Sequence, residues 1–268
     1  MSAGPEREAR WPRLVPPVAL GLAGLAAWEL AVRGLDVPAY VVPAPTLIAS
    51  TLVAEWGQLG AALLVTLRVT LLALATAVAL GVALAVLFSL SRWIELSLFP
   101  WAVVLQVTPI VAIAPLIIVW TRDRTTLALL ICAWIVAFFP ILSNTILGLN
   151  SADHNLINLF QLYGASRWQT LRYLRLPAAL PYFLGGLRIS GGLALIGAVV
   201  AEFVAGSGGT ASGLAFRILE AGYQLKIPRM FAALAMVSGA GIVLFLVLSL
   251  ISHLLLRRWH ESAIRREN

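Results

Sequence analysis

The chain has 268 residues, of which 60% are hydrophobic and only 12% are charged, and its mean hydropathy is +0.93. Soluble domains carry about a quarter charged residues, so this composition excludes an ordinary water-soluble fold and indicates a protein of the lipid bilayer. The net charge of +7 does not indicate a nucleic-acid-binding protein, because the basic residues lie at the ends of apolar segments rather than in one patch.

Six apolar segments are long enough to cross a bilayer, which takes about 20 helical residues. In chain order, the expected spans are 14–32, 63–90, 98–120, 127–147, 182–204 and 230–256. A secretory signal peptide is the alternative for the first, but its apolar run exceeds the usual length of about 7–15 residues, so we expect a retained anchor. An amphipathic segment, 46–58, follows, with Thr46 as its N-cap. Prolines 100, 109 and 115 predict kinks in the third span.

The basic residues predict an orientation. With both ends of the chain on one side, that side holds 11 of the 19 basic residues and the other holds 6, while Arg68 and Arg188 lie within spans. Cytoplasmic segments carry the excess of Lys and Arg. The sequence therefore predicts an all-α polytopic membrane protein with a six-span domain over 14–256, cytoplasmic tails at 1–13 and 257–268, and a cytoplasmic loop at 150–177.

This loop has the pattern of a surface helix. Leu156, Leu159, Phe160 and Tyr163 fall at i, i+3, i+4 and i+7 and form one apolar face. The loop thus begins with an amphipathic helix. A lipid surface, the protein's own bundle and a partner protein are the three possible covers of its apolar face, but a lipid-facing helix usually carries basic residues beside that face, and this one has none.

A second helix follows a turn. Gly164 stands where a left-handed C-cap is expected, and Ser166 with Gln169 matches a capping box that starts a new helix. Pro177 and Pro181 are expected to end that helix.

The spacing within this loop resembles a known family. Gly164, nine residues, Leu174, Arg175 and then Leu176-Pro177 resemble the EAA loop of ATP-binding-cassette (ABC) importer permeases. The runs Gly185-Gly186-Leu187-Arg188 and Ala201-Glu202-Phe203 are similar, more narrowly, to nitrate/sulfonate/taurine-type permeases and their pyrimidine-precursor relatives. Where the family has Glu-Ala-Ala, this chain has Asn158-Leu159-Phe160, which removes the polar contact of the family's glutamate.

The resemblance implies a type I ABC importer transmembrane fold and a coupling helix seated on a cytoplasmic ATPase subunit. The ATPase-coupling residues would be Leu156, Asn158, Leu159, Phe160, Tyr163, Gly164, Ala165, Ser166, Arg167, Leu176 and Pro177. The chain would work as a homodimer in the inner membrane of a prokaryote. It would receive a small solute (a sulfonate or taurine, nitrate, or a pyrimidine or vitamin precursor) from an external binding protein. The sequence has no phosphate-binding loop, and the glycine-rich run 206–213 lacks its lysine, so we expect no enzyme activity in this chain.

Polar residues within the spans are candidates for the translocation path: Gln106, Thr108, Asn144, Arg188 and Glu202. For Glu202 we favour a structural pairing, with Arg68 as the candidate partner, and for Arg188 snorkelling to the cytoplasmic surface. Small residues at every fourth position predict close helix contacts at Ala77, Gly81 and Ala85 and at Gly186, Ser190 and Ala194. No metal or cofactor site is expected. A self-sufficient secondary transporter or channel is the alternative function.

Overall fold

The computed structural model describes residues 11–122, 124–206 and 212–257, and every regular element in these ranges is a helix. The predicted all-α class is therefore confirmed. In chain order the elements are α1 (Trp11–Gly34), α2 (Pro45–Ala54), α3 (Trp56–Leu90), α4 (Arg92–Val107), α5 (Ile110–Thr121), α6 (Thr125–Leu149), α7 (His154–Leu162), α8 (Arg167–Thr170), the π-helical turn η1 (Leu171–Arg175), α9 (Leu176–Ala205), α10 (Leu214–Tyr223) and α11 (Ile227–Leu256). Most of both predicted tails and of the glycine-rich run lies outside the described residues.

Within the described ranges, five helical segments are long and apolar enough to span a membrane: Val15–Gly34, Trp56–Leu90, Thr125–Leu149, Arg167–Ala205 and Ile227–Leu256. The third predicted span, 98–120, is bent by 102° between α4 and α5, a kink of the kind that its prolines predict. The break falls at Thr108 and Pro109, both with extended backbone. Proline lacks an N–H and disfavours a helical residue before it, so the chain turns here. The count of six spans holds when this bent pair is taken as one.

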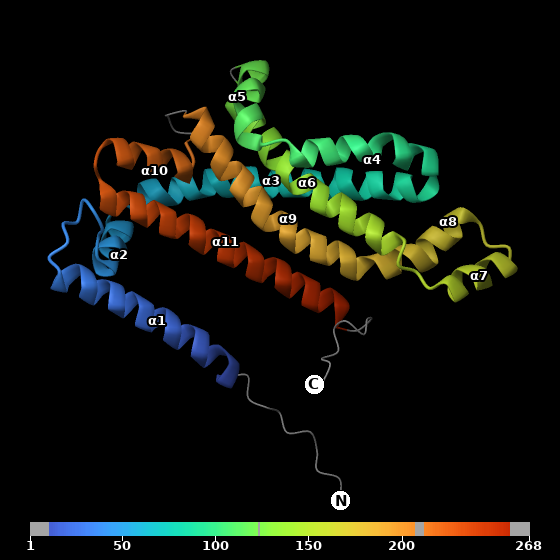
Figure 1. Cartoon of the computed structure of the whole chain (residues 1–268), viewed down its shortest axis with the longest axis horizontal. Helices are drawn as coiled ribbons and strands as arrows, with labels where there is room; N and C mark the ends of the chain where they lie inside the picture. Colours follow the sequence, from blue (N-terminus) through green and yellow to red (C-terminus); the bar gives the residue numbers. More distant parts are fainter. Residues whose placement is uncertain (1–10, 123, 207–211, 258–268) are drawn as a thin grey trace, which may run out of the picture.

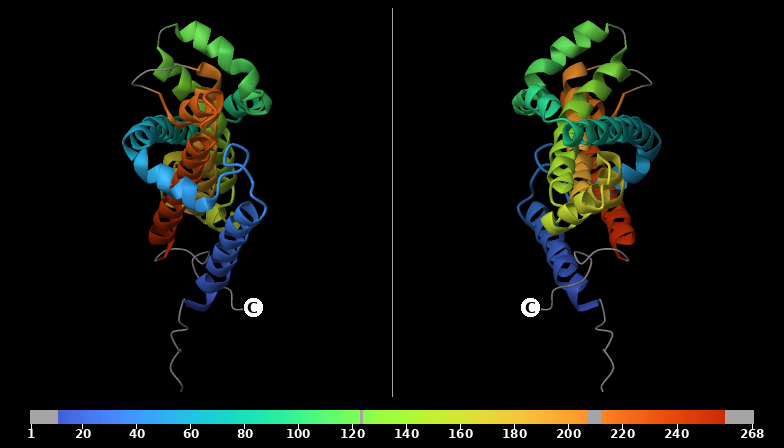
Figure 2. Two further views of the ribbon diagram at one scale, coloured as in Figure 1. Left: turned by 90° about the vertical axis from the view of Figure 1, so that its left-hand side faces the viewer. Right: turned by 90° about the vertical axis from the view of Figure 1, so that its right-hand side faces the viewer.

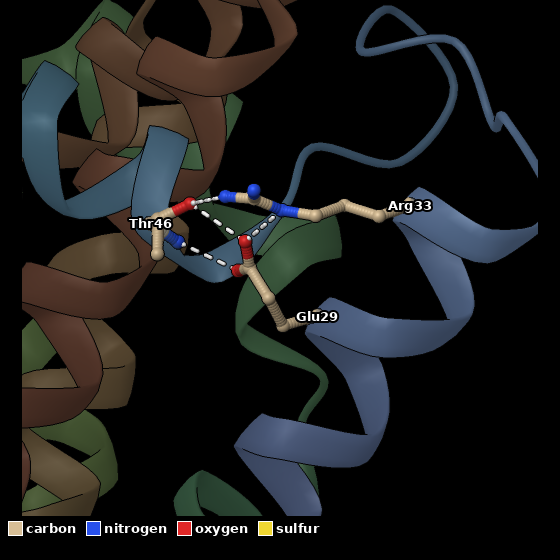
Figure 3. A network of polar contacts seen from close by, with 3 residues as sticks. All are labelled: Glu29, Arg33 and Thr46. Carbon is tan, nitrogen blue, oxygen red and sulfur yellow. Dashed lines mark hydrogen bonds and ion pairs between the residues drawn. The ribbon is translucent and has the colours of Figure 1, made fainter.

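The junction of α1 with α2 corrects another detail. The amphipathic segment 46–58 is divided at Glu55 into α2 and the start of α3, and α2 begins at Pro45, so Thr46 is not its N-cap. Instead the Thr46 N–H donates to Glu29 Oε2 at 3.0 Å and its hydroxyl to Glu29 Oε1 at 2.8 Å, while Arg33 Nε lies 2.6 Å from the same carboxylate (Figure 3). The carboxylate of α1 thus supplies the acceptor that the first turn of α2 needs.

The core is built on α3, α6 and α9, which pack at short range through small residues. A Cβ on Gly81 would lie 2.8 Å from Ile141 Cγ2, and one on Gly186 would lie 2.7 Å from the Pro140 carbonyl oxygen. Ser190 donates to the Ala137 carbonyl at 2.7 Å. The predicted small-residue contacts are therefore present, and they join helices of the same chain.

The arrangement has two distinct ends and one outlying helix. In Figure 1, α7 and α8 lie at one end of the long axis, which we call the loop end, and α2 and α10 lie at the other, the far end. Both views of Figure 2 show α1 apart from the stack of long helices. No residue in the apolar window of Val15–Gly34 is buried. Besides the Glu29 network, Trp28 contacts Phe231 of α11, with ring centroids 6.2 Å apart.

Candidate functional site

The first helix and the turn of the loop that follows α6 fold as the sequence predicts. Asp153 caps α7 by accepting from the Asn155 N–H at 2.8 Å. Gly164 has a φ of +69°, the left-handed conformation expected of a glycine after a helix. The predicted capping box of Ser166 and Gln169 is present, with hydrogen bonds of 2.7 and 3.2 Å. These three devices fix where α7 starts, where it ends and how the chain turns back.

The second helix of the loop does not end at Pro177 or Pro181, and this part of the prediction is wrong. The chain continues as one helical segment from Arg167 to Ala205, with Pro177 in the first turn of α9. The π-helical turn η1 precedes the proline, and the Leu176 N–H bonds the Leu171 carbonyl five residues back. A wide turn of this kind relieves the clash that a proline ring makes with the preceding turn of a regular helix.

The apolar face of α7 lies open to the surroundings. Leu156 and Leu159 are each 45% exposed and Tyr163 is 83% exposed, while Phe160 is half-buried. No residue of α7 is buried. The side of α7 that faces the rest of the chain carries Ile157 and Gln161, which line a cavity beside the end of α3. The chain's own bundle therefore does not cover the predicted face.

The remaining loop residues lie around this helix. Asn158 and Pro177 are exposed, and Leu176 is half-buried in an apolar groove between α3 and α9. Ala165 and Arg167 line the same cavity as Gln161. The sequence-predicted coupling residues are thus gathered at the loop end, on one helix–turn–helix unit.

Glu202 is the most constrained of the predicted path residues. It is only 4% exposed, and its carboxylate accepts from the Thr66 hydroxyl at 2.8 Å and from the Ala215 N–H at 3.0 Å. The Thr66 oxygen also accepts from the Leu214 N–H at 2.9 Å. Together they satisfy the first two N–H groups of α10 and tie this helix to α3 and α9. The expected pairing with Arg68 is not formed, because Arg68 is exposed and lies on a different side of α3 from Thr66.

Two residues of this site were missed by sequence reasoning. Thr66 resembles any other threonine of an apolar helix, and Gly213 belongs to a run that predicts only a flexible turn. A Cβ on Gly213 would collide with the carboxyl group of Glu202, so this position is glycine for space rather than for backbone conformation. No local sequence signal indicates either role, since the three partners come from segments distant in sequence.

The other path candidates are spread over the bundle. Gln106 is exposed near the end of α4, and the Thr108 hydroxyl donates to the Val104 carbonyl at 2.7 Å, at the bend before α5. Asn144 donates to the Pro140 carbonyl at 2.9 Å, and its Cβ packs at the Gly186 contact. Arg188 is half-buried near the middle of the long Arg167–Ala205 segment, and its Nε has no hydrogen-bond partner. These residues do not form one cluster within the described chain.

A charged cluster at the far end was also missed. Arg229 is 7% exposed, with Nε 2.7 Å from Glu55 Oε2 and Nη2 donating to Gln58 Oε1 at 2.6 Å. Glu220 lies 3.8 Å from Arg229 and 2.8 Å from Arg217, and the hydrogen bond from Arg217 holds the pKa of Glu220 below its ordinary value. This cluster joins the α2–α3 junction to α10 and α11.

Comparison with known proteins identifies the family. Residues 77–261 match the family described as the binding-protein-dependent transport system inner membrane component. The matched range covers more than half of the chain, and the chain belongs to this family of ABC transporter permeases. It is a multi-pass membrane protein and a transport component, as the resemblance of its loop implies.

Individual relatives agree with this assignment. The riboflavin transport system permease protein of Chloroflexus aurantiacus is 39% identical, over 94% of this chain and 92% of that protein. The formylaminopyrimidine transport permease protein of Halalkalibacterium halodurans is 30% identical, over 90% and 94%. The putative aliphatic sulfonates transport permease protein of Bacillus subtilis is 31% identical, over 91% and 84%. A solved amino acid ABC transporter shares the fold, with a TM-score of 0.62 at 20% identity, covering 77% of this chain and 96% of that one.

Proposed function

We propose that this chain is the membrane-spanning subunit of an ABC importer and that α7 couples it to a separate cytoplasmic ATPase. The observation that carries the proposal is the open apolar face of α7. Leu156, Leu159 and Tyr163 expose much of their surface although they lie on a capped, well-defined helix. Fully burying a leucine side chain stabilises by about 1.5–3 kcal/mol, and these side chains would gain part of that energy if covered, so a partner surface is expected here.

A protein groove is the cover that fits the chemistry. An amphipathic helix that lies on lipid carries basic residues on its polar face, and α7 has none. A short helix with apolar anchors one turn apart is suited to a groove on a partner. The turn at Gly164, Ala165, Ser166 and Arg167, together with Leu176 and Pro177, would hold α7 at a fixed angle. Asn158, in place of the family's glutamate, leaves this coupling to the apolar contacts.

The loop end would then face the cytoplasm. The excess of basic residues on the side of the two tails, 1–13 and 257–268, supports an orientation with both ends of the chain inside. The family's description as an inner membrane component supports the inner membrane of a prokaryote. ATP would be hydrolysed in the partner, since the sequence has no phosphate-binding loop.

A second copy of the chain would complete the path. On α9, Tyr182, Ile189 and Ile196 recur every seven residues and are 39%, 54% and 56% exposed. Gly185 and Gly192 lie between them with open space where a Cβ would stand. An exposed apolar stripe with this spacing suits a helix that meets its own copy.

The translocation path would run beside α9. Arg188, half-buried and without a partner for its Nε, is the first candidate to meet the solute, followed by Asn144, Gln106 and Thr108. Glu202 would act by holding α10 at the outer mouth, about 21 Å along α9 from Arg188. An external binding protein would deliver the solute there. The relatives that transport riboflavin and formylaminopyrimidine support a vitamin or vitamin precursor as the solute.

The decisive experiment introduces one charge into the apolar face. We expect Leu159→Asp to abolish ATP-driven uptake and co-purification of the ATPase, while the amount of permease in the membrane stays unchanged. His154→Asp is the matched control, because it adds the same charge to the same helix on the side opposite the apolar face and should retain uptake. Normal uptake by Leu159→Asp, or uptake by the purified permease without ATPase or nucleotide, would refute the proposal; the latter result would favour a secondary transporter.

A further inference from the structure

The cavity behind α7 has the chemistry of an anion-binding site. Its volume is about 330 Å³, near the lower end for ligand pockets, and it lies between the end of α3 and the loop. Its lining includes two guanidinium groups, an amide and two hydroxyls: Arg167, Arg175, Gln161, Thr170 and Ser89.

The two arginines lack a counter-ion. Within the described ranges, neither Arg167 nor Arg175 forms an ion pair, whereas the nearby Arg92 is bound to Glu95 at 2.8 Å. No acidic residue is among those that line the cavity. Two cations that line one cavity repel each other, and an anion bound between them would replace this repulsion with attraction. Guanidinium groups match the oxygens of a phosphate or carboxylate with two parallel hydrogen bonds.

The donors free for a ligand are specific. The Ser89 and Thr170 hydroxyls already donate to the carbonyls of Val86 and Ser166, at 2.8 and 3.1 Å. Only their oxygens remain, as acceptors. Three side chains of the cavity make no hydrogen bonds within the described chain: the guanidinium groups of Arg167 and Arg175 and the amide of Gln161. Because the free groups are mainly donors, a ligand rich in acceptor oxygens suits the cavity.

The π-helical turn η1 brings the two arginines together. They are eight residues apart, and at about 100° per residue a regular helix would place them about 80° apart around its axis. One extra residue in a wide turn reduces this offset to about 20°. Arg175 therefore comes to lie below Arg167 on the same side of the helical segment. The turn that accommodates Pro177 thus also assembles the cationic wall of the cavity.

The surroundings favour a lipid as the source of the anion. An apolar groove of about 510 Å³ follows between the same helices, lined by Val82 and Ala83 of α3 and by Leu176 and Phe183 of α9. Val82 and Ala83 lie about two turns from Ser89, deeper in the span. A polar head in the cavity would leave room for an acyl chain in the groove.

We infer that this cavity binds a phosphate group, held by Arg167 and Arg175, and that a lipid headgroup and a free phosphate ion are its two possible sources. The test uses the full-length permease in detergent. Its single cysteine, Cys132, is buried, so a thiol-reactive dye reports unfolding. The unfolding midpoint is measured with added phosphatidylglycerol, with phosphatidylcholine and with inorganic phosphate.

We expect phosphatidylglycerol to raise the unfolding midpoint more than phosphatidylcholine does. R167Q and R175Q should each weaken the apparent affinity for phosphatidylglycerol about tenfold, the loss expected for one charge-assisted contact. A rise with inorganic phosphate alone that equals the lipid effect identifies a free anion as the ligand. Arg172→Gln is the matched control, because Arg172 lies over the Tyr173 ring, outside the cavity lining, and should keep the wild-type response. Equal responses of wild type, R167Q and R175Q, or an equal loss in R172Q, overturn the site. No ATPase is present, so this outcome is independent of the coupling proposal.

Discussion

Gly213→Ala is expected to destabilise the protein through the carboxylate of Glu202. The new Cβ would overlap the carboxyl group, which must leave its position against Thr66 and the start of α10. Two hydrogen bonds to a buried charged group are then broken, at 2.8 and 3.0 Å. Each contributes about 1.5–3 kcal/mol, so the upper limit is roughly 6 kcal/mol; relaxation recovers part of it, and we expect about 2–4 kcal/mol.

The thiol-reactive dye assay at Cys132 measures this change. For a chain of this size, about 1 kcal/mol shifts the unfolding midpoint by roughly 2–4 °C, so a loss of about 2–4 kcal/mol lowers it by about 4–16 °C. Gly239→Ala in α11 is the control, since nothing lies within 4 Å of its Cβ position and alanine favours the helix by about 0.5–1 kcal/mol. If Gly213→Ala unfolds at or above the wild-type temperature, Glu202 does not depend on the space at Gly213 and the reasoning is refuted.

Three further predictions concern packing and charge. Gly186→Val should lower the free energy of unfolding by about 3 kcal/mol, because its side chain meets the Pro140 carbonyl of α6; an unchanged dye-detected midpoint would contradict this contact. Arg229→Gln leaves Glu55 without its partner and should cost about 2 kcal/mol in the same assay, whereas a smaller loss than that of exposed Arg33→Gln would contradict a structural role. The lowered pKa of Glu220 means that its contacts stabilise the fold above about pH 4.5 and that this stabilisation is lost as the pH falls through the lowered value. Glu220→Gln should therefore reduce stability by about 1 kcal/mol or less at pH 7 and by less at pH 3, measured by circular dichroism, and a larger deficit at pH 3 than at pH 7 would contradict the sign.

The sequence alone determined the features that depend on local patterns. The apolar segments, the cap at Gly164, the capping box of Ser166 and the apolar face of α7 are each encoded within a few residues, where periodicity and side-chain chemistry act directly. The resemblance of the loop gave the family for the same reason. The spacing of residues within one segment does not depend on how that segment packs against the rest of the chain.

Only the tertiary structure decided how distant segments meet. Pro177 was expected to end a helix, but the π-helical turn before it allows the helix to continue. The prolines of segment 98–120 predict kinks, but only the structure shows that the chain bends by 102° at Thr108 and Pro109. The partner of Glu202 proved to be Thr66 rather than Arg68, because the rotation of α3 about its axis depends on packing against α6 and α9. Helix bends and side-chain partners of this kind depend on the space between packed helices and on the hydrogen-bond acceptors that a helix end requires. Both involve residues from several segments, so neither can be predicted from one segment alone.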